Sequence, residues 1–346
     1  MHSAVSTRSG EIARLAGLDW ARLVCLVGIF FAHSGVRLTP WVFWLCNELA
    51  PVLFVSLVGV TSRLTSKDRG SIFAYAGYLT VIGFALSMFV PSVITVLPTL
   101  AAVMVLLSVV PDRLVSVLLT AVLAVAGSIA GWKMGFTGAY TIDYAAAVSS
   151  PLDGLRAFAF SGAYPLTSYL FAAVLCRWAV RQVAPLRKHD GAGVAGVFVA
   201  ISVAAIGSVH VRFFSLDPNL VSNPGAESGY GIAAILLSPQ VHAGSIAVVL
   251  YGVAVVAGMS LVEGGWSPAA SKASLTGYVL SVVLYGAPVL WVSVACLAFM
   301  EVCALAFGKG VIEWAFSVLD RAGRQRRESA QKPRHDVRSG ARNGRS

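Results

Sequence analysis

Charged residues are scarce in this sequence. Asp, Glu, Lys and Arg make up only 12% of the 346 residues, whereas hydrophobic residues make up 57%. A soluble globular domain has about a quarter charged residues and about half apolar residues. A water-soluble globule is therefore excluded, as are a disordered chain, a collagen-like repeat and a small disulfide-rich scaffold.

Motifs for metal binding and for common soluble enzymes are also missing. The five cysteines all lie in apolar segments, and none is spaced from another as metal ligands are. We therefore expect buried free thiols and no metal site. The chain has no Walker phosphate loop, no G-x-S-x-G nucleophile elbow and no H-E-x-x-H zinc motif.

Long unbroken apolar stretches are abundant. Stretches of this kind predict membrane-spanning helices, and they lack the alternation of an outer-membrane barrel. We expect an all-α fold, a polytopic integral membrane helical bundle of about ten transmembrane helices. A short amphipathic helix at the interface is expected over 309–320. The predicted spans are 18–38, 41–62, 72–91, 93–110, 114–132, 157–180, 192–211, 243–262, 272–287 and 289–307.

Basic residues concentrate in alternate segments between these spans, which predicts cytoplasmic placement of both termini in a multi-pass plasma-membrane protein. The expected organisation is a cytoplasmic segment over 1–17, a transmembrane domain over 18–320 and a disordered basic tail over 321–346. The tail holds nine Lys and Arg against Glu328 and Asp336, so it contributes +7 of the net charge of +10. We expect this tail to contact anionic membrane lipid, and no nucleic-acid partner is expected.

Ionisable residues inside predicted spans are functional candidates because their burial in lipid is costly. Arg22 and His33 lie eleven positions apart on the first span. They therefore lie about 20° apart around the helix and roughly 16 Å apart along it. A membrane anchor is the alternative interpretation of Arg22, and an interhelical hydrogen bond is the alternative for His33. Glu301, in the last span, is either a proton relay or a structural hydrogen-bonding group.

The first two spans resemble a known superfamily. Leu18-Asp19-Trp20-Ala21-Arg22, followed after ten residues by His33, resembles the first helix of membrane acyltransferases of the acyltransferase-3 type. The second span, 50–60, is similar to the glycine-ended second helix of the same superfamily. It is more similar still to the relatives that include the heparan-glucosaminide acetyltransferases and the DUF418 proteins.

Two segments near the C-terminus extend this resemblance. Residues 271–278, Ser-Lys-Ala-Ser-Leu-Thr-Gly-Tyr, resemble the G-R-M-S-L-T-N-Y stretch of DUF418 proteins. Residues 308–314, Gly-Lys-Gly-Val-Ile-Glu-Trp, are similar to their G-P-L-E-W stretch.

The resemblance implies transfer of an acyl group, with acetyl expected, from cytoplasmic acyl-CoA to a hydroxyl or amine of an extracytoplasmic glycan or glycolipid. His33 is the expected general base, and an acyl-histidine intermediate is the less economical route. His242, at the start of the eighth span, is the second candidate base. Glu48, one helix away, is a candidate for orienting the imidazole of His33. The cations expected to hold the donor phosphates are Arg22, Arg63, Lys67 and Arg69.

Two functions of other classes stay open at this stage. A transporter or flippase would work without acyl-CoA and would not need the pair of Arg22 and His33. A non-catalytic scaffold would bind its partners through the basic tail, so deletion of 322–346 would abolish its role.

Overall fold

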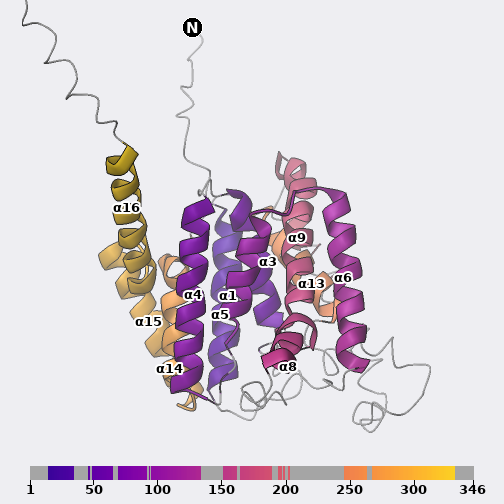
Figure 1. Cartoon of the computed structure of the whole chain (residues 1–346). Coiled ribbons are helices and arrows are strands. Elements are labelled where there is room, and N and C mark those ends of the chain that lie inside the picture. The colour runs from indigo at the N-terminus through magenta and orange to yellow at the C-terminus, as the bar shows by residue number, and fades with distance from the viewer. Residues whose placement is uncertain are drawn as a thin grey trace, which may run out of the picture.

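The computed structural model describes residues 15–34, 46, 49–64, 69–91, 93, 95–133, 151–161, 164–188, 194–196, 198, 202, 245–262 and 267–331. Throughout these ranges the regular elements are helical, and no strand occurs in them. The all-α prediction is therefore confirmed. Figure 1 shows a bundle of helices that run roughly along a common direction. The α-helices are α1 (Ala16–His33), α3 (Ala50–Leu64), α4 (Arg69–Phe89), α5 (Leu97–Leu107), α6 (Leu114–Lys133), α8 (Pro151–Arg156), α9 (Leu166–Val183), α13 (Ile246–Met259), α14 (Ser274–Val283), α15 (Val289–Phe307) and α16 (Val311–Gln331).

Three helical stretches are long and apolar enough to cross a membrane: Ala16–His33, Arg69–Phe89 and Val289–Ala322. Shorter apolar helices occupy four further predicted spans, as Ala50–Ser62, Leu97–Leu107, Leu114–Ala130 and Ile246–Met259. The fold is thus all-helical with three candidate membrane-spanning stretches, while the count of about ten spans stays a prediction. Most of the predicted span 192–211 lies outside the described residues.

The predicted span 157–180 is divided in the structure. Residues Ala157–Ser161 form one π-helical turn, and the regular helix α9 begins only at Leu166. Pro165 precedes α9 in an extended conformation. A proline has no amide hydrogen and clashes with the preceding turn, so it begins a helix more readily than it continues one.

Helix α9 packs at the centre of one half of the bundle, against α3, α5, α6 and α13. Tyr169 and Cys176 on this helix are completely buried. Gly59 of α3 lies so close to α9 that a methyl group in its place would meet the carbonyl oxygen of Ala173. Small residues allow this approach of two backbones, which is typical of helix packing in membranes. All five cysteines are buried free thiols, as the sequence predicts.

The last helix differs from its sequence-based prediction. The amphipathic helix expected over 309–320 is α16, which begins at Val311 and continues to Gln331. It therefore enters residues 321–331, a segment predicted as part of the disordered tail. Arg, Gln, Glu and Ala, all good helix formers, fill most of this extension, and Pro333 follows shortly after its end.

Candidate functional site

A cavity of about 340 Å³ opens at the end of the bundle where α1 begins. It lies between α1, α3, α4, α5 and the short helical turn η4 (Ala269–Ala273) that leads into α14. Its lining combines apolar side chains with hydroxyl groups and two cationic residues. The lining residues are Arg22, Phe54, Leu57, Val58, Thr61, Ser62, Ile72, Tyr75, Met104, Leu107, Ser108, Ser271, Lys272 and Ser274.

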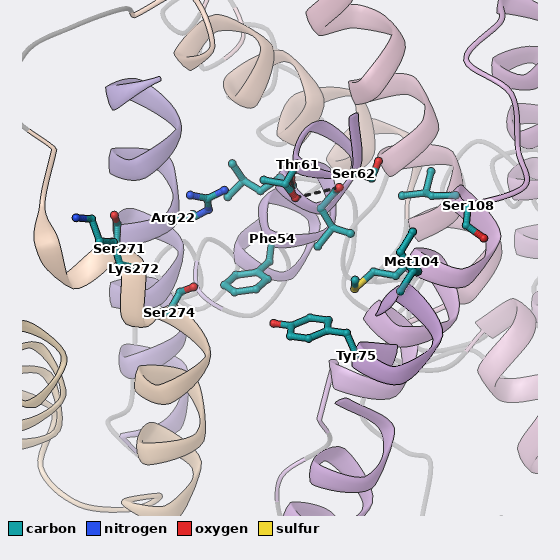
Figure 2. A pocket seen from close by; sticks show the side chains of 14 residues that line it. Arg22, Phe54, Thr61, Ser62, Tyr75, Met104, Ser108, Ser271, Lys272 and Ser274 are labelled. Carbon is teal, nitrogen blue, oxygen red and sulfur yellow. Dashed lines mark hydrogen bonds between the residues drawn. The ribbon is translucent and has the colours of Figure 1, made fainter. Parts of the chain in front are cut away.

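Arg22 brings a positive charge to this cavity. Its Nη1 donates to Oδ1 of Asp19 at 2.9 Å, one turn earlier on α1. Asp19 is only 1% exposed, and its second oxygen accepts a hydrogen bond from Ser267 Oγ at 2.5 Å. This buried carboxylate, bound by both an arginine and a hydroxyl, orients the guanidinium. Figure 2 shows Arg22 and Tyr75 reaching into the cavity from different helices, with Phe54 between them.

The segment 269–276 is held in place by two carboxylates. Glu301 of α15 accepts a hydrogen bond from the amide of Ala270 at 2.9 Å. Glu313 of α16 accepts hydrogen bonds from the amide of Leu275 and from Oγ1 of Thr276, both at 2.6 Å. These acceptors satisfy amides at the starts of two helical elements, which otherwise lack partners. Glu301 is therefore a structural hydrogen-bonding group here.

Lys272 differs from Arg22 in its exposure. Its side chain is exposed, and in Figure 2 its amino group points away from Arg22. Ser271 and Ser274, on either side of it, are buried and partly buried. The guanidinium of Arg22 is therefore the charge that faces the interior of the cavity.

His33 lies at the opposite end of α1, packed against α14 and 8% exposed. Its Nδ1 is 3.0 Å from Oγ of Ser281, and Ser281 donates its only hydroxyl hydrogen to the carbonyl of Tyr278 at 2.7 Å. This contact joins the imidazole of His33 to α14. The rings of Tyr278 and Tyr285 lie edge-on to the imidazole at 6.0 and 6.3 Å.

The structure separates the predicted site residues. Arg22 lines the cavity, whereas His33 is outside its lining, about 16 Å further along α1 by helical rise. Arg69 is exposed at the start of α4 and is not a lining residue of this cavity. Glu48, Lys67, His242 and the side chain of Arg63 lie outside the described residues.

Several lining residues carry no signal in the sequence. Thr61, Ser62, Ser108 and Tyr75 are hydroxyl-bearing residues inside apolar spans, and nothing in their spacing distinguishes them from packing residues. Tertiary packing of α3, α4 and α5 brings them together. In the described part of the chain, no group of three or more His, Cys, Asp or Glu is arranged to hold a metal ion.

Comparisons with known proteins were made at three levels. No family model, no curated protein and no solved structure matches the chain.

Proposed function

We propose that the protein is an integral membrane acyltransferase. It transfers an acyl group, with acetyl expected, from cytoplasmic acyl-CoA to a hydroxyl or amine of an extracytoplasmic glycan or glycolipid. The proposal includes about ten spans in the plasma membrane and cytoplasmic placement of both termini. One observation carries it: α1 brings the guanidinium of Arg22 to a cavity near its start and the imidazole of His33, hydrogen-bonded to Ser281, to its other end.

The cavity supports a role in donor binding. Its volume of about 340 Å³ falls in the range of small-molecule sites, although it suits one part of a coenzyme A thioester rather than the whole molecule. Arg22 can form charge-assisted hydrogen bonds with a phosphate of the donor. The apolar lining side chains, which include Phe54 and Met104, can accept the less polar arm that bears the thioester.

His33 supports a role in proton transfer. The lone pair on Nε2 takes the proton of the acceptor hydroxyl while the hydroxyl oxygen attacks the thioester carbonyl. A carbon–oxygen bond forms, the carbon–sulfur bond breaks, and the imidazolium returns the proton to the departing thiolate. Ser281 is the positioning residue, because its hydrogen bond with Nδ1 orients the ring. The donor arm has to extend along α1 for its thioester to reach this end.

The decisive experiment is thiol release from acetyl-CoA by the purified full-length protein, with and without a glycan and glycolipid extract. We expect release that requires the extract and that falls about 10²- to 10⁴-fold in His33→Ala. Arg113→Gln is the matched control, because Arg113 is exposed and is not a lining residue of the cavity. A wild-type protein that binds no acyl-CoA and releases no thiol with any extract would contradict the proposal.

A second variant tests the positioning role of Ser281. Ser281→Ala should lower kcat about tenfold and leave the KM for acetyl-CoA unchanged, because it removes the partner that orients the imidazole of His33. Ser281→Thr keeps the hydroxyl and should restore most of the lost rate. If Ser281→Ala changes thermal stability but not kcat, its role is structural only.

A further inference from the structure

Helix α16 presents two chemically different sides, and one of them packs against the bundle. Phe316 stacks on Tyr78 of α4 at 4.9 Å and lies edge-on to Tyr75 at 5.1 Å. Asp320 accepts a hydrogen bond from Ser71 at 2.6 Å. Because contacts move towards the start of α4 as α16 advances, the two helices run antiparallel. Figure 1 shows α16 continuing past the start of α4.

The other side of α16 is apolar and exposed. Val311, Trp314 and Val318 are 39%, 42% and 41% exposed, and their spacing of three and four residues places them in one stripe. Arg321 follows Val318 by three residues and so continues the same stripe. It is exposed, and its Nε donates to the carbonyl of Ser317 at 3.2 Å.

This stripe continues the outer surface of α15. The chain turns between the two helices at Gly308, whose φ of 70° is accessible to glycine at little cost. The rings of Phe307 and Trp314 lie 5.8 Å apart across this turn. Val302 and Leu305 on α15 are 62% and 73% exposed. An apolar surface of this extent is the kind that faces the hydrocarbon of a membrane.

Along α16 the charged residues change from acidic in the first half to mostly basic in the second half, and the basic half complements an anionic lipid headgroup. Its two acids in the first ten residues, Glu313 and Asp320, are hydrogen-bonded to α14 and α4. Residues 321–331 then carry four arginines and one glutamate, namely Arg321, Arg324, Arg326, Arg327 and Glu328. An apolar stripe that ends at a run of arginines matches a phospholipid, whose acyl chains lie below an anionic phosphate.

We infer that α16 stands in the cytoplasmic leaflet and binds anionic phospholipids. The stripe of Val311, Trp314 and Val318 contacts the acyl chains, and the arginines from Arg321 onwards bind the headgroups. This inference rests on the membrane placement of the proposed function and is independent of acyl transfer.

The test is quenching of tryptophan fluorescence by lipids with brominated acyl chains. The full-length protein is reconstituted in dioleoylphosphatidylcholine vesicles that contain a small fraction of brominated phosphatidylglycerol or of brominated phosphatidylcholine. Subtracting the signal of Trp314→Phe isolates Trp314. Trp291, which is 71% exposed at the other end of α15 and distant from the arginine run, is isolated in the same way with Trp291→Phe and is the matched control.

We expect brominated phosphatidylglycerol to be preferred at Trp314 by about fivefold over brominated phosphatidylcholine, which is the effect of about one well-placed arginine. Trp291 should show no preference. The double variant Arg321→Gln with Arg324→Gln should abolish the preference at Trp314. Arg342→Gln with Arg345→Gln, which removes the same charge from the far end of the tail, should keep it.

Four outcomes would overturn the inference. Equal preference at Trp314 and Trp291 would show that the protein does not select anionic lipid at α16. If the double variant in α16 and the double variant in the tail lose the preference at Trp314 equally, the preference is an effect of net charge. Quenching of Trp291 without quenching of Trp314 would show that protein covers the stripe, whereas quenching of neither would refute the membrane placement as well.

Discussion

Glu313 accepts a hydrogen bond from Thr276 across 37 positions of sequence, with 2.6 Å between Oε2 and Oγ1. The Oγ1 of Thr276 in turn accepts from the amide of Ile312 at 3.1 Å. The start of α14 and the start of α16 are thus joined by reciprocal hydrogen bonds.

Replacement of Glu313 by Gln should lower the free energy of unfolding by about 2 kcal/mol, because a partly buried carboxylate acceptor of several hydrogen bonds is lost. Thr276→Val should be destabilising as well. In the double variant the two effects should not add, because each single change already breaks the shared bond. Thermal unfolding of all four proteins in the same detergent measures the coupling. Strict additivity would show that the bond contributes nothing.

Gly59 of α3 and Gly77 of α4 offer a matched pair of glycine substitutions in two consecutive helices. Gly59→Ala should destabilise the protein by at least about 2 kcal/mol, because its methyl group would clash with the backbone of Ala173. Gly77→Ala has open space around its new methyl group, so the higher helix propensity of alanine should stabilise the protein by up to about 1 kcal/mol. Melting temperatures should therefore shift in opposite directions. A similar shift for both variants would contradict the close approach of α3 and α9.

Arg177 and Arg181 lie one turn apart on α9, and their contributions to the stability of the protein should differ sharply. Arg177 is buried and donates to the carbonyls of Leu107 and Val110 at 3.1 and 2.7 Å, where α5 ends. Arg177→Gln should cost about 2 to 3 kcal/mol, because it leaves carbonyls at a helix end without a charged donor. Arg181→Gln removes only an exposed contact of 3.5 Å and should change stability by less than about 0.5 kcal/mol. Chemical denaturation of the two variants compares these costs.

Arg22 should affect donor binding more than turnover if the proposed function holds. Arg22→Gln should raise the KM for acetyl-CoA about tenfold or more, since a charge-assisted hydrogen bond is lost. Arg22→Lys should recover only part of this loss, because an ammonium does not reproduce the planar guanidinium. The KM of Arg113→Gln should equal that of the wild type. Melting temperatures of the same variants separate this effect from the loss of the ion pair with Asp19.

Helical periodicity and the length of an apolar stretch are local properties of the sequence. The positions of helices could therefore be predicted from the sequence. The spans predicted over 114–132 and 289–307 correspond to α6 and α15 within one or two residues. Arg22 was a candidate because a cation inside an apolar run is costly wherever the helix packs. The extension of α16 to Gln331 was missed, because a run of arginines that predicts disorder by charge also has high helix propensity.

The sequence by itself determined the all-α class, the apolar helices and the presence of Arg22 and His33 on one helix. Only the tertiary structure decided that Arg22 faces a cavity while His33 packs on Ser281, and that Tyr75, Thr61 and Ser62 share the lining with Arg22. The physical reason is that helix formation depends on neighbours within a few residues. The cavity depends instead on which faces of α1, α3, α4 and α5 meet, and close packing at glycines such as Gly59 selects those faces.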